Sequence, residues 1–170
     1  MSEPVKVNVV SYGGVKPGQM IVGNGADGSK ITLFDAAIAT NGTEMFKGRS
    51  GLTSWSVALP NLTNGSYMFQ GCSGLTSFTA DLPKLTNGSQ MFYNCSALTS
   101  FTANLPELTN GWTMFQASGL TSWTIALPSL KEASGMFFTC YRLTSFTADL
   151  PELTNGSNMF FFILRYIVPI

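Results

Sequence analysis

Apolar and polar positions along this chain recur with a period of 23 residues. The phrase LTSFTADLP stands at 75–83 and again at 143–151, LTSFTANLP stands at 98–106, and looser copies are LTSWSVALP at 52–60 and LTSWTIALP at 120–128. Their leading leucines are 23, 23, 22 and 23 residues apart, and the dipeptide Met–Phe recurs in the same way. Periods of about 20 to 30 residues are typical of solenoids, in which each repeat packs on its neighbours.

Alternation within each copy predicts one short strand per repeat. Leu75, Phe78 and Ala80 have the spacing that leucine-rich repeats use around their strand. Successive side chains of a strand point to opposite faces, so the aromatic residue and the small residue two positions later point inward, while Ser77 and Thr79 point outward. We therefore expect one buried column that contains Phe78, Phe101, Trp123 and Phe146.

The segments between these strands predict turns. The proline of each copy closes its strand, because proline cannot donate to the next strand. The Thr-Asn-Gly triplets at 63–65, 86–88, 109–111 and 154–156 are expected to turn the chain, with glycine at positive φ. The segment between turn and strand, MFYNCSA in one copy, is expected to form a single helical turn.

The aligned pattern, M-F-x-x-C-x-x-L-x-x-F-x-x-x-L-P, resembles the BspA-type leucine-rich repeat over about residues 45–160. The resemblance rests on the Met–Phe, Cys and Leu anchors and on the 23-residue length. It implies a curved repeat solenoid with one short parallel β-strand per rung, and with turns and short helical segments on the other side. It also implies a surface protein associated with adhesion or host contact.

The ends depart from the repeat, which divides the chain into an N-terminal cap at 1–28, a solenoid of five to six repeats at 29–160 and an apolar C-terminal tail at 161–170. The cap contains a candidate strand, VKVNVVSY, and should cover the apolar edge of the first rung. Residues 31–46 form an incomplete repeat, with Ile31 and Phe34 in the anchor places.

The terminal segments also bear on location. The first residues lack the basic start and apolar stretch of a secretory signal, so an extracellular or surface location is suggested by the resemblance alone. The tail contains Arg165 and is too short to span a bilayer. It either folds back over the last rung or forms an interface for self-association.

Composition limits the kinds of partner and functional site that the chain can have. Nine basic and nine acidic side chains cancel without any run of one sign, so a nucleic-acid partner is not expected. The chain has no histidine, which removes the commonest general base and metal ligand. The scattered carboxylates of Asp81, Glu107, Asp149 and Glu152 suit a solvated edge better than a catalytic pair or a calcium site. The sequence therefore predicts no enzyme, no cofactor and no metal.

Three cysteines, Cys72, Cys95 and Cys140, occupy one position of the repeat. Arg49, a deletion after Ala117 and Ile163 fill that position in the other copies. We expect a buried stack of thiols, since free cysteine packs as a small hydrophobe. Cys72 and Cys95 would lie on adjacent rungs about 5 Å apart, which also leaves a disulfide open.

Two exposed stripes remain. The first is the outward strand ladder, and it contains Ser54, Ser56, Ser77, Thr79, Ser100, Thr102, Ser122, Thr124, Ser145 and Thr147. Its hydroxyls suit half-exposed strands, which favours a structural role, and the alternative is a flat array that binds ice or a crystalline polymer.

The second stripe is where the repeats differ from one another. It surrounds the constant Met–Phe pair and contains Tyr67, Gln70, Gln90, Tyr93, Trp112, Gln116, Phe138 and Tyr141. Tyr, Trp and Phe are the residue types that anchor interfaces, whereas drift at unconstrained sites should favour small polar residues. We interpret these eight residues as the candidate ligand-binding residues.

Two hypotheses of different class follow. The first is a non-catalytic binding or adhesion solenoid that recognises a protein or a glycan through the varied aromatic stripe. The alternative is a structural subunit of a virion, fibre or other assembly that stacks through its solenoid ends. The varied stripe favours the first hypothesis, and the apolar tail favours the second.

Overall fold

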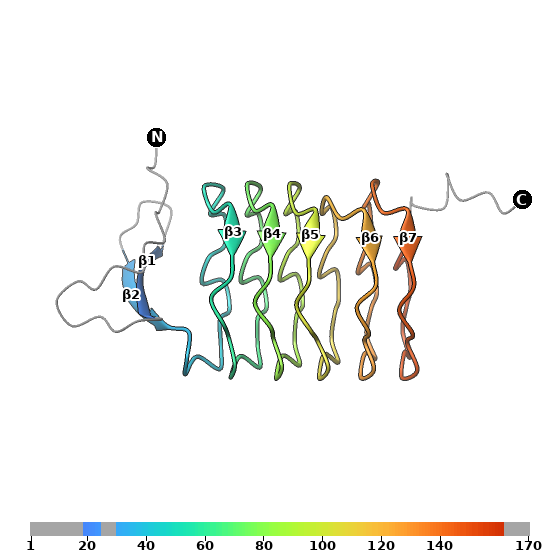
Figure 1. Cartoon of the computed structure of the whole chain (residues 1–170), viewed down its shortest axis with the longest axis horizontal. Helices are drawn as coiled ribbons and strands as arrows, with labels where there is room; N and C mark the ends of the chain where they lie inside the picture. The colour runs from blue at the N-terminus through green and yellow to red at the C-terminus, as the bar shows by residue number, and fades with distance from the viewer. Residues whose placement is uncertain (1–18, 25–29, 162–170) are drawn as a thin grey trace, which may run out of the picture.

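The computed structural model describes residues 19–24 and 30–161 and shows an elongated solenoid that follows a hairpin (Figure 1). The hairpin pairs β1 (Gln19–Asn24) with β2 (Lys30–Asp35) in antiparallel register, Gln19 opposite Asp35. The two-residue strands of the solenoid are β3 (Ser54–Trp55), β4 (Ser77–Phe78), β5 (Ser100–Phe101), β6 (Ser122–Trp123) and β7 (Ser145–Phe146). The predicted strand VKVNVVSY and tail residues 162–170 lie outside the described residues.

A ladder of single parallel bridges divides the solenoid into rungs. The bridges join Asn41, Asn64, Asn87, Asn110, Glu132 and Asn155 in turn, and we number rungs 1 to 6 from these residues. Rung 1 therefore begins at Asn41, and the segment before it, where the sequence predicts an incomplete repeat from Ile31, pairs within the hairpin. The Asn64 side chain accepts a hydrogen bond from the Ser66 N–H at 3.0 Å, which fixes the local bend.

The glycine of each Asn-Gly pair is required for packing and not for positive φ, which corrects the prediction from the sequence. Gly65 does not have positive φ. A Cβ atom built on Gly65 would lie 2.8 Å from the sulfur of Met91, and one built on Gly88 would lie 2.7 Å from that of Met114. The methionine of each following rung therefore occupies the space that a side chain would need.

The segments around the Met–Phe pairs are turns, and the described residues contain no helix. Left-handed residues such as Tyr67 (φ 59°) and Gly71 (φ 72°) recur in them and interrupt any helical run. In rung 2 the N–H groups of every second residue point at rung 3, where they donate to the carbonyls of Asn87, Ser89, Met91 and Tyr93 at 2.8 to 3.0 Å. A main-chain ladder thus replaces the predicted helical turns.

Two interleaved columns of aromatic rings fill the interior. Phe78 stacks on Phe101 at 5.5 Å between ring centroids, and Phe101 stacks on Trp123 at 5.5 Å, so the predicted column is confirmed for these three residues. The phenylalanines of the Met–Phe pairs form the second column, and Phe92 meets Phe78 edge-on at 4.9 Å. Phe146, which ends the predicted column, is only partly buried.

The three cysteines are free and buried, as the sequence predicts. The thiol of Cys72 donates to the Phe46 carbonyl at 3.1 Å, and burial raises its pKa to about 11. Ser118 takes the cysteine position of rung 4, is buried, and lies 3.4 Å from the sulfur of Cys140. The deletion therefore falls one residue later than the sequence suggests, after Ser118, because Ala117 keeps the left-handed conformation of Gly71.

The deletion leaves a seam on the strand side. β3, β4 and β5 form one parallel sheet and β6 and β7 another, with no pairing between β5 and β6 in the described chain. The aromatic column nevertheless continues across the seam, since Phe101 and Trp123 remain stacked. Side-chain packing therefore bridges the place where the strand hydrogen bonds stop.

Candidate functional site

The residues that vary between rungs lie beside the Met–Phe pairs, on what we call the variable face, and all of its positions except the buried Ser66, Ser89 and Gly135 are at least partly exposed. Its first column contains Thr43, Ser66, Ser89, Trp112, Ser134 and Ser157, its second contains Glu44, Tyr67, Gln90, Thr113, Gly135 and Asn158, and its third contains Lys47, Gln70, Tyr93, Gln116, Phe138 and Phe161. Every residue of the second column has positive φ. Matching positions of successive rungs therefore line up in these three columns along the solenoid.

The candidate residues fall into these columns with one exception, Tyr141. Trp112 belongs to the first column and Thr113 is the equivalent of Tyr67, so Tyr67 and Trp112 do not share a column. Tyr141 follows the buried Cys140 and lies outside all three columns, with 69% of its surface exposed. Tyr67, Tyr93 and Phe138 are half-buried, because each ring lies partly against its neighbouring rungs.

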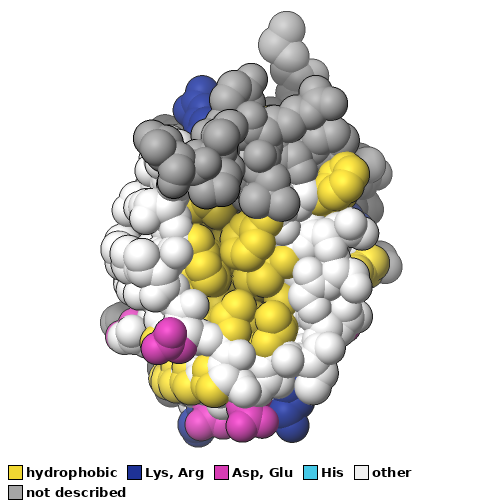
Figure 2. Space-filling view, turned by 90° about the vertical axis from the view of Figure 1, so that its right-hand side faces the viewer, with side chains coloured by type: hydrophobic (Ala, Val, Ile, Leu, Met, Phe, Trp, Pro, Cys, Tyr) yellow, Lys and Arg dark blue, Asp and Glu magenta, His cyan; other side chains and the backbone are white. Residues whose placement is uncertain are grey.

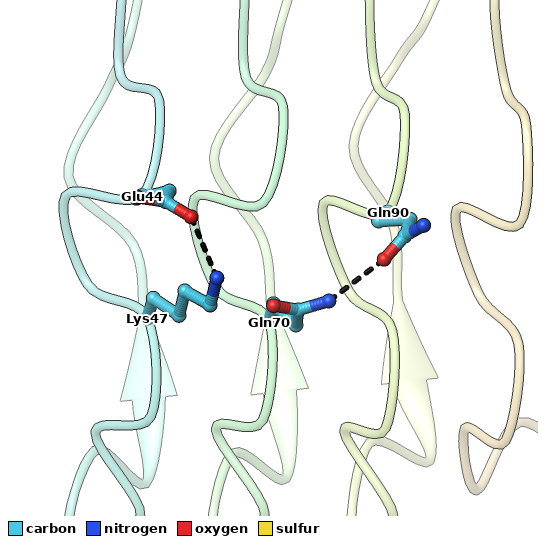
Figure 3. Close-up of polar contacts among 4 residues, drawn as sticks. All are labelled: Glu44, Lys47, Gln70 and Gln90. Atoms are coloured by element: carbon cyan, nitrogen blue, oxygen red, sulfur yellow. Dashed lines mark hydrogen bonds and ion pairs between the residues drawn. The ribbon is translucent and has the colours of Figure 1, made fainter.

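Side chains of rungs 1 to 3 pair with one another on this face (Figure 3). Lys47 forms an ion pair with Glu44 at 2.6 Å, and its ammonium group lies 5.3 Å from the ring centroid of Tyr67. The Gln70 amide donates to the Gln90 amide oxygen at 2.7 Å. These contacts satisfy much of the polar chemistry at this end of the variable face, so little of it remains for a ligand.

Rungs 4 to 6 form a shallow, open depression of about 250 Å³ on the same face. Its lining consists of Trp112, Thr113, Gln116, Ser134, Gly135, Phe138, Ser157 and Asn158. The indole of Trp112 is 42% exposed, and the ring of Phe138 stacks on that of Phe161 at 5.3 Å. Gly135 contributes no side chain at the place where Tyr67 and Gln90 stand in other rungs, and this leaves the floor of the depression open.

Three of the eight candidate residues, Trp112, Gln116 and Phe138, line this depression. Its other lining residues are not apparent from the sequence, because Ser134 and Ser157 match the repeat and resemble structural residues. Gly135 was the available signal, since glycine replaces a bulky residue there in a row that otherwise varies among larger side chains.

The depression is electrically neutral. None of its lining residues carries a charge, and the described part of the chain contains no group of His, Cys, Asp or Glu side chains that could hold a metal ion. The arrangement can offer aromatic surface, two amides and several hydroxyls to a ligand. These lining residues include no nucleophile–base pair.

Comparison with known proteins agrees with this architecture. A profile described as the BspA type leucine rich repeat region matches residues 62–164 in six copies. The chain belongs to the BspA-type leucine-rich repeat family. No curated protein sequence matches the chain. A leucine-rich repeat protein from Bacteroides ovatus is similar in structure, with a TM-score of 0.54 and 27% identity over 67% of this chain and 30% of that one.

Membership of the BspA-type family carries general expectations. The family supports a repeat-based binding or adhesion role, is generally non-catalytic and is typically surface-associated. Among the described residues, no helix is long and apolar enough to cross a membrane. The chain matches less than a third of the length of its Bacteroides ovatus neighbour, so a shared scaffold is what the comparison establishes.

Proposed function

We propose that this chain is a non-catalytic binding and adhesion solenoid that recognises a protein or glycan partner at a cell surface or in a secreted assembly. The observation that carries the proposal is the alignment of the varied residues on one face of an otherwise repeated scaffold. The proposed contact residues on this face are Tyr67, Gln70, Gln90, Tyr93, Trp112, Gln116 and Phe138, and the exposed Tyr141, which lies outside its three columns, is proposed as an additional contact.

The hydrogen bonding beneath the variable face supports this proposal. The N–H groups of Gln90 and Asn94 donate to main-chain carbonyls of rung 4 at 3.0 and 2.8 Å, so the ladder does not depend on side-chain identity. Exposed residues of the first and third columns can therefore change with little effect on folding. Tyr and Trp give large, rigid contact areas at low cost in conformational entropy, which is what a recognition surface needs.

The alternative, a structural subunit that stacks through its ends, is favoured by one observation. Apolar side chains gather at the C-terminal end of the described solenoid (Figure 2). Phe146, Leu150 and Phe160 are only partly buried there, whereas Phe101 and Leu105 are buried in rung 3. A further layer of protein at this end would complete their burial.

The test compares the wild-type chain with the double variant Tyr93→Ser/Trp112→Ser on a printed glycan array and a protein microarray. The matched control is Ile38→Ser, which removes an exposed apolar side chain (71% exposed) outside the variable face. The proposal expects signals that the double variant loses and the control keeps. Signals common to all three chains, or none at all, would contradict it. Light scattering after size-exclusion chromatography then detects stacking as a mass that rises with concentration.

A further inference from the structure

The depression in rungs 4 to 6 differs from the neighbouring rungs 2 and 3 in the pairing of its amide side chains. Within the described chain, the side-chain amides of Gln116 and Asn158 have no hydrogen-bond partner, whereas Gln70 and Gln90 bind each other. An amide offers both a donor and an acceptor, and the hydroxyls of Ser134 and Ser157 do the same. The depression therefore presents neutral groups that can both donate and accept hydrogen bonds, arranged around an exposed indole.

The absence of charge in the lining excludes several ligand classes. Phosphates, sulfates and carboxylates are recognised by Arg, Lys or clustered N–H groups, and organic cations outside aromatic cages by acidic side chains. The ion pair of Glu44 and Lys47 lies in rung 1, away from rungs 4 to 6. Affinity at the depression must therefore come from contact with aromatic surface and from neutral hydrogen bonds.

We infer that the depression is a subsite for one neutral sugar ring, a hexose or an N-acetylhexosamine, within a longer glycan; this inference rests on the proposed function. A sugar ring has a C–H face that packs on an aromatic plane, here Trp112, and a rim of hydroxyls that both donate and accept. Gln116 and Asn158 are positioned on the lining to bind that rim.

Size and shape support this ligand class. Ligand pockets for drug-sized molecules have volumes of about 300 to 1,000 Å³, and this depression, at about 250 Å³, has room for a single ring. It is open at the surface, so the bound ring can stay linked to neighbouring rings along the variable face. The mixture of amides, hydroxyls and aromatic surface also differs from the aromatic and apolar anchor pockets of protein interfaces.

The chain provides its own optical probe for the test. Of its three tryptophans, Trp55 and Trp123 are each 2% exposed and lie in the core, so acrylamide should quench mainly Trp112. Cellohexaose, chitohexaose and mannohexaose are titrated to about 10 mM, a range that covers the millimolar affinity of a single-ring site. A heparin hexasaccharide is the charged comparison. The inference expects at least one neutral oligosaccharide to shield Trp112 from acrylamide, and heparin not to shield it.

Two variants distinguish the depression from the rest of the face. Gly135→Asn adds a side chain at the floor, where its Cβ would lie 3.1 Å from Thr113 Cγ2, and asparagine is chosen because Asn158 adopts nearly the same φ, 55° against 60°. It should weaken binding at least tenfold while Trp112 stays open to acrylamide. Ile38→Ser should bind as the wild type does, and thermal melts should confirm that both variants fold.

The possible results separate this inference from the proposed function. Equal binding by the wild type and Gly135→Asn, shielding by heparin alone, or no shielding by any neutral oligosaccharide would each overturn the sugar subsite. If protein-array signals are lost in Tyr93→Ser/Trp112→Ser while no sugar shields Trp112, the proposed function stands and its ligand is a protein. If the arrays also give no signal, both proposals fail.

Discussion

The two sides of each rung are joined to the neighbouring rung in different ways. On the strand side, β3 to β7 pair through two residues each, and the pairing stops between β5 and β6. On the side of the variable face, rung 3 donates to rung 4 from Gly88, Gln90, Phe92 and Asn94 at 2.8 to 3.0 Å, across the same boundary. The side whose sequence varies most therefore has the more regular main-chain bonding.

This difference explains where the chain tolerates change. The repeated threonines near the strands use their side chains structurally, since Thr76 Oγ1 donates to the Thr53 carbonyl at 2.9 Å and Thr144 Oγ1 to the Thr121 carbonyl at 3.2 Å. Such bonds constrain side-chain identity and favour a structural role for this part of the surface. The variable face is joined through its main chain, so its side chains remain available for recognition.

The largest expected effect is on the core between the two sides. Phe101→Ala should lower the free energy of unfolding by about 3 to 5 kcal/mol, because it removes a ring that contacts Phe78, Phe92, Phe115 and Trp123. Urea denaturation followed by circular dichroism measures the change. A loss below about 1 kcal/mol would mean that the aromatic column does not join the two sides.

Much of the fold follows from the sequence for a simple reason. Burial of Phe78 and Ala80 follows from strand alternation, which a period-two pattern records directly, and burial of Leu75 follows from its fixed place in the repeat. The conformation of the Met–Phe segments could not be predicted, because it depends on positive φ at ordinary residues such as Tyr67 and Gln90. That conformation is stabilised by main-chain bonds to the next rung, which leave no trace in residue type.

The candidate site could also be predicted only in part from the sequence. The variation of Trp112, Gln116 and Phe138 marked the right surface, since variation is visible in a repeat. Ser134 and Asn158 escaped notice because they match the repeat consensus or look like turn residues. Their place in the depression depends on the register between rungs, which the bridge from Glu132 to Asn155 fixes.

The second prediction concerns the cysteines beneath the variable face. Burial raises the pKa of Cys72 to about 11 and also raises the pKa values of Cys95 and Cys140 above the ordinary value of 9.0. Between pH 9 and 11 the unfolded chain therefore loses thiol protons that the native chain keeps. The free energy of unfolding should be unaffected by the thiols below pH 9 and should fall above it, by about 1.4 kcal/mol per pH unit for each thiol.

Urea denaturation at pH 8, 9 and 10 measures this slope. The control is the triple variant Cys72→Ser/Cys95→Ser/Cys140→Ser, because Ser118 already occupies the same position in rung 4. Tyrosine and lysine titrate in both chains, so the difference between them isolates the thiols. Equal slopes, or rapid labelling of all three thiols in the native wild type, would show that the stack is open to solvent.

The third prediction concerns a variant that should restore the missing strand pairing between β5 and β6. Insertion of one serine between Ser118 and Gly119 restores the 23-residue spacing and should allow β6 to pair with β5. A gain of about 1 kcal/mol in stability is expected, since each added hydrogen bond contributes about 0.5 to 1.5 kcal/mol. Hydrogen exchange should slow at Ser122 and Trp123, and unchanged exchange there would show that the deletion is not what separates the sheets.

The smallest expected effect on stability is that of substitutions on the variable face, and it tests most directly whether this face is separate from the core. Tyr93→Ser/Trp112→Ser should change the free energy of unfolding by no more than about 0.5 kcal/mol for each substitution, because surface replacements away from the core usually fall within that range. Most of any loss in stability should come from Tyr93, because its ring is half-buried. Trp112 is 42% exposed, and the main-chain N–H of residue 112 still donates to the Asn110 side chain after the substitution. Matched urea denaturation of the wild type, the double variant and Ile38→Ser measures it. A loss of several kcal/mol would place these rings in the core and make the variable face part of the scaffold, whereas a stable double variant leaves recognition as the reason for large aromatic residues there.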